Sequence, residues 1–338
     1  MTPKIVILAT LDTKGREVAF LKDLVESHGA STILVDIAPL GPPLLEPDYS
    51  GEEIAALGGS DLSSLLEKGQ RGDIMEVMGR GAAALLMDLF KRGKVNGVLD
   101  LGGNQGTSIS ATAMKALPLG LPKVLLSTVG SGNVRPFVGH KDILIMFSVG
   151  DMLGGPNALT RSILENAAAA LLGMIEKGRG AFQGIGQKTI AITELGNTEK
   201  GASHAVTLLR ARGYEVLPFH ASGAGGSAME ELVAAGSIQG IFDLTPHELA
   251  EEVVGAGAYI PVRPGRMTAA SRAGIPQVVS TGALEYLCFG PRDSIPARLR
   301  HRKIYMHNPL NANLKLSRRE MGASGGQGLK GLTCPRAA

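Results

Sequence analysis

The sequence contains no tryptophan, and aromatic residues make up only 4% of its 338 residues. So few rings argue against a platform on which single-stranded nucleic acid could stack its bases. The formal net charge is only +3, too small to indicate a polyanionic partner. We therefore expect no nucleic-acid partner.

Cysteine is equally scarce, since only Cys288 and Cys334 are present. Two such residues indicate neither a zinc cluster nor a disulfide framework, and no metal ligand is assigned from the residues alone. Cys288 lies in the apolar stretch LEYLCFG, which is typical of a core thiol rather than a nucleophile.

Long hydrophobic runs are also lacking. The N-terminal apolar run ends before Asp12 and is typical of a buried strand, not of a signal peptide. No stretch is judged long enough to cross a bilayer. The sequence therefore predicts a cytoplasmic protein without a membrane partner.

Apolar runs alternate with helical patterns along the first half. Strands are expected at 4–10, 31–38, 95–101 and 122–128, and helices at 16–28, 74–92 and up to 117, with an irregular excursion after residue 38. This alternation predicts an α/β fold with a parallel sheet covered by helices on both faces. A long helix over 154–180 is expected to join this half to a second one.

The second half repeats the pattern of the first. ILATLDTKG aligns with AITELGNTEKG, VNGVLDLGG with IQGIFDLTP, and PKVLLST with PQVVST, in the same order. We predict two Rossmann-like parallel-sheet subdomains, over 1–153 and 181–310. The remaining segment, 311–338, is basic and rich in Gly and Ser, and is expected to be disordered.

Glycine is abundant, with 46 residues, and it gathers after predicted strands. LGGNQGTS (101–108) and STVGSGN (127–133) combine glycines with hydroxyls. Such loops can bind phosphate with their amides and with the N-terminal end of the next helix, at the edge where open parallel sheets bind ligands. Closure of ordinary βα turns remains the alternative.

The DTKG segment lies at the same predicted edge. Lys14 can supply a positive charge beside Thr13, and Asp12 can hold a metal ion or a ribose hydroxyl. Neither a Walker A pattern nor a dinucleotide fingerprint is present. The segment TPHELAEE contains His247 and Glu248 but not H-E-x-x-H, which argues against a zinc protease.

The second half has its own loop of small residues, FHASGAGGSAME (219–230). The helix that follows offers its N-terminal end to an anion, and His220 is suited to acid–base chemistry. A strand-end histidine satisfied by backbone groups is the alternative. The candidate residues of this second site are His220, Ser222, Gly223, Gly225, Gly226 and Glu230.

Five segments, in order, resemble the Tm-1-like ATP-binding family, named after the N-terminal domain of the tomato mosaic virus resistance protein: ATLDTKG, LGGNQGTS, STVGSGNV, FHASGAGGSAME and AGIPQVVSTGALEYLCFGPRD. The resemblance implies two Rossmann-like subdomains, ATP with Mg²⁺ in the first of them, and a homodimer. On these motifs the phosphate-binding loops fall on Gly102, Gly103, Asn104, Gln105, Gly106, Thr107, Thr128, Gly130, Ser131 and Gly132.

Two functions follow as hypotheses. The first is an ATP(Mg)-binding protein with a regulatory role or a protein partner. The alternative is an enzyme that acts on a phosphorylated or carboxylated small molecule bound between the two subdomains. No catalytic residue is assigned.

Overall fold

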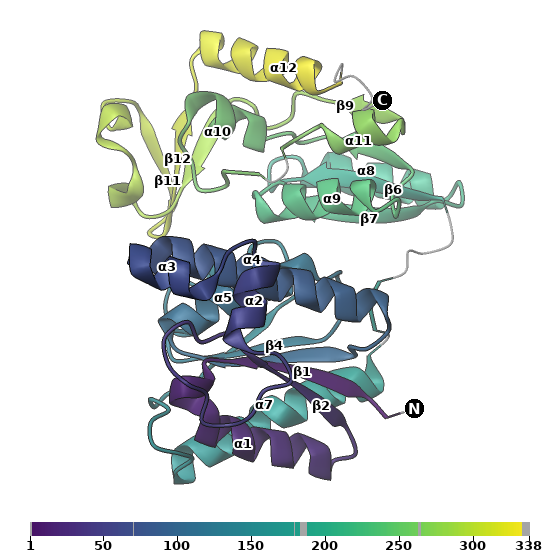
Figure 1. The fold of residues 1–338 in the computed structure, drawn as a ribbon. Coiled ribbons are helices and arrows are strands. Elements are labelled where there is room, and N and C mark those ends of the chain that lie inside the picture. The colour runs from purple at the N-terminus through teal and green to yellow at the C-terminus, as the bar shows by residue number, and fades with distance from the viewer. Residues whose placement is uncertain (1, 70, 179, 183–187, 263–264, 333–338) are drawn as a thin grey trace. The chain divides into compact units, whose positions relative to one another are not determined.

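The computed structural model describes residues 2–69, 71–178, 180–182, 188–262 and 265–332 (Figure 1). The chain divides into two compact units, Met1–Phe182 and Gln183–Ala338, called here the first and the second unit. The sequence predicted that a long helix over 154–180 joins two halves. The structure instead places the helix over 158–177 within the first unit.

The first unit is a five-stranded parallel sheet with the order β2-β1-β3-β4-β5. This confirms the predicted α/β class. Its elements are β1 (Lys4–Ala9), α1 (Leu11–Ser27), β2 (Ser31–Asp36), α2 (Gly51–Leu57), α3 (Leu62–Lys68), α4 (Arg71–Lys91), β3 (Gly97–Gly102), α5 (Asn104–Ala116), β4 (Lys123–Ser127), α6 (Arg135–Val138), β5 (Leu144–Phe147) and α7 (Ala158–Lys177).

Both faces of this sheet are buried, because successive side chains of a strand point to opposite faces. Val6 and Leu8 of β1 pack with α2, α4 and α5, whereas Ile5 and Ile7 pack with α1 and α7. Figure 1 shows these two sets of helices on opposite sides of the sheet. A continuous apolar run such as KIVILA is what a doubly covered parallel strand requires.

Two further sequence predictions for the first unit differ from the structure. The excursion after β2 contains α2, which begins with a capping box between Ser50 and Glu53. No stretch was expected to be long enough to cross a bilayer, but α7 could do so by its length and composition. One such helix is weak evidence, and the core cluster that includes Leu164 and Leu171 packs α7 against the sheet.

The second unit contains a four-stranded parallel sheet with the order β7-β6-β8-β9. Its core clusters pack α9 and α11 on one face and α8 on the other. The elements of the parallel part are β6 (Thr189–Glu194), α8 (Glu199–Arg210), β7 (Glu215–His220), α9 (Ala224–Ala234), β8 (Gly240–Asp243), α10 (Glu248–Val254), α11 (Ala269–Ala273) and β9 (Gln277–Val279).

The two parallel sheets share their topology, because β2-β1-β3-β4 and β7-β6-β8-β9 place equivalent strands in the same order. The first residues of β1 and β6 also make equivalent hydrogen bonds. Lys4 N–H donates to Asn96 Oδ1 at 2.8 Å, and Thr189 N–H donates to Gln239 Oε1 at 2.9 Å. The structure thus agrees with the internal repeat predicted from the sequence.

A three-stranded antiparallel sheet, β10-β12-β11, follows the repeat. Its elements are β10 (Tyr286–Phe289), two 3₁₀ turns (Arg292–Ser294 and Ala297–Leu299), β11 (Ile304–Asn308), β12 (Asn311–Lys315) and α12 (Arg318–Leu332). The segment expected to be disordered thus forms a strand and a helix up to residue 332. Ala312, Leu314 and Leu316 alternate into a core cluster, a period of two that the sequence analysis overlooked.

Candidate functional site

The strand order of the first unit changes direction between β1 and β3, which is where open α/β sheets bind ligands. Helix α1 begins directly after β1, and α5 begins directly after β3. A Cβ on Gly106 would lie 3.6 Å from Thr10 Cγ2, so the two helix starts are neighbours. The first amides of each helix lack acceptors within the helix.

Helix α1 starts earlier than expected, at Leu11 rather than residue 16. Asp36 explains this start, because its Oδ1 accepts hydrogen bonds from the amides of Leu11 and Ala38, at 3.1 and 2.9 Å. Burial raises the pKa of Asp36. The carboxylate that fixes the helix start comes from the neighbouring strand, so local sequence could not reveal it.

The DTKG segment therefore forms the first turn of α1. Thr13 Oγ1 donates to Asp12 Oδ1 at 3.2 Å. Lys14 Nζ donates to the carbonyl oxygen of Met152 and lies 3.6 Å from Asp151 Oδ1. With its side chain only 12% exposed, Lys14 directs its charge at residues 151–152.

The glycine loop after β3 is the N-terminal turn of α5. Gly103 is the N-cap residue, and Asn104 and Gln105 start the helix with exposed and half-exposed side chains. Thr107 is fully buried, and its Oγ1 lies 2.7 Å from Ser127 Oγ. The hydroxyl of Thr107 thus ties α5 to β4 and does not face a ligand.

The turn after β4 lies beside this loop, since the Thr128 amide donates to Gly102 O at 3.2 Å. Thr128 and Gly130 are half-buried, whereas Ser131 and Gly132 are exposed. The structure thus brings the two predicted phosphate loops together at one sheet edge.

Asp100 lies within β3, two residues before the end of the strand, and its side chain is fully buried. Oδ1 accepts a 2.5 Å hydrogen bond from Ser110 Oγ, while Oδ2 has no partner. Burial raises the pKa of Asp100 to about 7, although the bond from Ser110 opposes the shift.

In the second unit, the small-residue loop after β7 is closed by packing. A Cβ on Gly223 would lie 2.1 Å from Tyr259 O, and one on Gly226 would lie 2.5 Å from Glu248 Oε1. Gly223 also has a φ of +83°, which favours glycine. Ser222 is half-buried and bonds back to His220 O. Close contacts thus account for these residues, with backbone atoms at Gly223 and with the side chain of Glu248 at Gly226.

Replacing Gly225 by alanine is expected to destabilise the second unit by about 1–3 kcal/mol. The new Cβ would lie 2.0 Å from His220 O and 3.0 Å from His220 C, both backbone atoms that cannot swing away. Urea unfolding followed by circular dichroism measures the change. Gly201→Ala is the control, because its Cβ would meet only Leu244 Cδ2 at 3.7 Å; equal stability of the two variants would contradict the packing argument.

Glu230 belongs to a buried cluster around Arg266. The guanidinium pairs with Glu230, Asp243 and Glu248 at 3.2, 2.7 and 3.1 Å, and all four side chains are fully buried. Both oxygens of Glu230 also accept backbone amides at the start of α11. Its carboxylate is therefore structural in this geometry.

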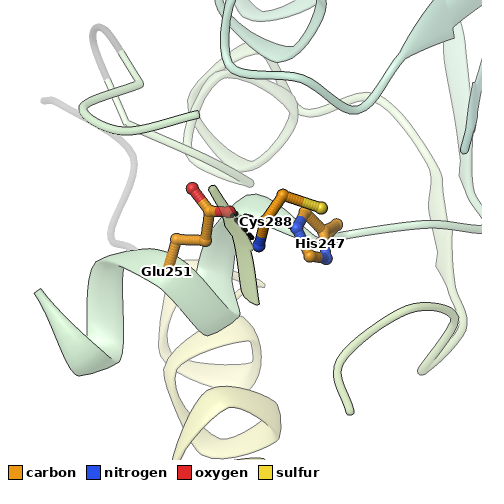
Figure 2. Close-up of side chains that lie close together, drawn as sticks. All are labelled: His247, Glu251 and Cys288. Carbon is orange, nitrogen blue, oxygen red and sulfur yellow. Dashed lines mark hydrogen bonds and ion pairs between the residues drawn. The ribbon is translucent and has the colours of Figure 1, made fainter. Parts of the chain in front are cut away.

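A second buried cluster joins His247, Glu251 and Cys288, as Figure 2 shows. His247 Nδ1 lies 2.7 Å from Ala283 O, and its Nε2 lies 3.3 Å from Glu251 Oε1. Burial alone would lower the pKa of His247, but Cys288 and Glu251 outweigh it and raise that pKa to about 10.

A cavity of about 450 Å³ adjoins this cluster. Cys288, Tyr259 and Tyr286 contribute to its wall, together with His220. His220 Nδ1 lies 2.8 Å from Glu194 Oε1, and its side chain is 53% exposed. The histidine singled out from the sequence thus stands at a cavity beside a carboxylate.

Sequence reasoning missed the two clusters of the second unit. In HELAE, His247 and Glu251 are spaced i, i+4 and so share a helix face, a signal that the search for H-E-x-x-H passed over. Arg266 and Cys288 carried no signal, because their partners lie 18 or more residues away along the chain.

Comparison with known proteins places this architecture in a family. Residues 3–179 match the model described as "Uncharacterised protein family (UPF0261) N-terminal domain", and residues 187–333 match the corresponding C-terminal domain. A UPF0261 protein of Clostridium tetani is 44% identical over 320 residues, covering 95% of this chain and 78% of that protein.

Two further relatives extend the comparison. A UPF0261 protein of Rhizobium meliloti is 37% identical, with 95% of this chain and 78% of that protein covered. The ToMV susceptible protein tm-1(GCR26) of Solanum lycopersicum is 33% identical, with 91% of this chain and 43% of that protein covered. With both of its domain models matched in turn, the chain belongs to the uncharacterised protein family UPF0261.

Proposed function

We propose that the first unit binds the phosphate groups of a nucleotide, ATP with Mg²⁺, at the carboxyl edge of its sheet. The observation that carries this proposal is the meeting of two helix starts, α1 and α5, at the switch point between β1 and β3. Helix N-terminal amides and the positive end of the helix dipole both favour an anion there. The family resemblance of the five motifs supports ATP as the ligand.

The geometry assigns the binding chiefly to the backbone. Lys14 already contacts residues 151–152, and Thr107 bonds Ser127. The amides of the turn after β4 are also engaged, since those of Thr128 and Gly130 donate to Gly102 O and Ser127 O. The amides of Gly103 to Gly106 are therefore the donors of the proposal, and Asp12 is the residue suited to Mg²⁺ or to a ribose hydroxyl. A regulatory role, a homodimer and the alternative enzyme remain predictions.

Gly103 allows a test of the site that separates charge from shape. It is the N-cap residue of α5 with no side-chain cap, and a Cβ there would meet only Thr128 Oγ1 at 3.9 Å. Asp and Asn are both favoured N-cap residues, so neither Gly103→Asp nor Gly103→Asn should lower the melting temperature. The carboxylate of the Asp variant would occupy the position of a phosphate and repel it.

We expect ATP with Mg²⁺ to bind the Asp variant at least tenfold more weakly than the Asn variant. Isothermal titration measures both affinities, and a thermal-shift series with ATP, ADP, AMP, NAD and phosphate, with and without Mg²⁺, identifies the ligand, because a ligand of the native state raises apparent stability. Equal affinity of the two variants would show that the phosphates do not bind at Gly103. An absence of any binding by the wild-type protein at millimolar nucleotide would refute the function itself.

A further inference from the structure

The cluster of His247, Glu251 and Cys288 unites three side chains that bind metal ions. His247 immediately precedes α10, Glu251 lies one turn later on the same face, and Cys288 lies on β10. One ligand atom from each residue lies within 4.8 Å of the others. All three residues are buried, so the cluster is part of the fixed interior of the second unit.

We propose that the second unit binds one transition-metal ion of the zinc class through the imidazole of His247, the carboxylate of Glu251 and the thiolate of Cys288. Zn²⁺ takes these three ligand types in tetrahedral sites. A thiolate with an imidazole disfavours Mg²⁺ and Ca²⁺, which prefer oxygen ligands. The proposal is independent of nucleotide binding by the first unit.

The distances suit such an ion. Two nitrogen or oxygen ligands held at about 2.0–2.1 Å in a tetrahedral site lie roughly 3.3 Å apart. His247 Nε2 and Glu251 Oε1 are 3.3 Å apart. Two of the three ligand atoms thus already have the separation that a bound ion would impose.

The outer partners hold the ligands in place, as second-shell groups do at metal sites. His247 Nδ1–H donates to Ala283 O at 2.7 Å, which leaves Nε2 to face Glu251. The ring of Tyr286 lies 4.9 Å from that imidazole, centroid to centroid. In the neutral imidazole that a metal ion binds, these contacts keep the proton on Nδ1 and hold the ring in its orientation.

Backbone groups position the carboxylate in the same way. Glu251 Oε1 accepts the amide of Cys288 at 2.9 Å, and Oε2 accepts the amide of Tyr259 at 2.7 Å. Gly257 makes room for the carboxylate, because a Cβ there would lie 2.1 Å from Glu251 Oε2. The chain thus reserves space for Glu251 and orients it towards His247.

The adjoining cavity provides the entry path that a metal site needs. Cys288 is 8% exposed and belongs to both the cluster and the cavity wall. An ion with three protein ligands keeps a fourth position for water or a small molecule. The cavity of about 450 Å³ is the side from which that fourth ligand would come.

The test is metal binding by the full-length protein. After removal of bound metal with a chelator, Zn²⁺ is titrated against a chromophoric competitor, and Co²⁺ is added to a second sample. We expect one Zn²⁺ per chain and, with Co²⁺, the near-ultraviolet absorption of a sulfur-to-cobalt charge transfer. Cys288→Ser should abolish that band and weaken Zn²⁺ binding at least a hundredfold, since second-shell losses alone cost 10–100-fold.

Cys334→Ser is the matched control, because it removes the other cysteine of the sequence and should leave stoichiometry and spectrum unchanged. A Co²⁺ band that persists in Cys288→Ser would overturn the proposed thiolate ligand. Fewer than about 0.1 Zn²⁺ per wild-type chain, with a native circular dichroism spectrum, would show that the cluster is a buried His–Glu pair without an ion. Elemental analysis of protein expressed in zinc-supplemented medium gives an independent measure of the same stoichiometry.

Discussion

Arg266→Ala is expected to destabilise the second unit by at least about 3–5 kcal/mol, the usual cost of removing one partner of a buried ion pair. Arg266 is the cation that faces Glu230, Asp243 and Glu248, all fully buried. These carboxylates also raise the pKa of Arg266. Since native domains are stable by only about 5–15 kcal/mol, we expect the second unit of this variant to be largely unfolded.

Chemical denaturation followed by circular dichroism gives the measurement, and hydrogen exchange of peptides from β8 and α9 assigns the loss to the second unit. Arg302→Ala is the matched control in the same unit. Arg302 pairs with Glu320 at 2.8 Å, but the two side chains are 26% and 21% exposed, so its removal should cost at most about 1 kcal/mol. A similar loss of stability in both variants would contradict the argument that burial makes the ion pairs of Arg266 more important than that of Arg302.

Wild-type stability of the first unit is expected to fall as the pH rises from 4 to 7, and Asp100→Asn should make this fall clearly smaller. The folded pKa of Asp100 is about 7, against 3.8 for the free side chain. Between these values the folded state keeps a proton that the unfolded state has lost, so rising pH favours unfolding. A shift of about 3 units corresponds to on the order of 4 kcal/mol.

Urea unfolding at several pH values measures this slope, with hydrogen exchange of β3 peptides identifying the first unit. Ser110→Ala supplies the opposite control. Ser110 donates the hydrogen bond that lowers the pKa of Asp100, so its loss should extend the fall in stability to higher pH. If wild type and Asp100→Asn have the same pH slope, Asp100 is not protonated in the folded state.

The sequence predicted β1 to β4 well because local patterns determine them, whereas β5, β11 and β12 were not predicted. KIVILA and GVLDLG are apolar runs that only doubly covered strands accommodate, and the structure places β1 and β3 within two residues of the expected bounds. The start of α1 was missed because Asp36, a residue of another strand, caps the amide of Leu11. Long-range partners of this kind leave no trace in the local sequence.

For the candidate sites, too, the sequence predicted some features and not others. The loops at the carboxyl ends of β3 and β4 could be located, because a parallel sheet fixes where they lie. The roles of single residues could not: Thr107 faces Ser127, and Glu230 caps α11. The glycines after His220 were interpreted as a ligand loop. Instead, backbone atoms leave no room for a side chain at Gly223 and Gly225, and the side chain of Glu248 leaves none at Gly226.

The shared strand order of the two parallel sheets has an evolutionary consequence. Gly97 pairs with Ile5, and Gly240 pairs with Ile190, so Asp100 and Asp243 occupy equivalent places three residues further on. Duplication of one ancestral α/β segment explains why both copies carry an acid in this interior position. The partners of the two acids differ: Asp243 pairs with Arg266, whereas Asp100 accepts a hydrogen bond from Ser110 and is able to hold a proton.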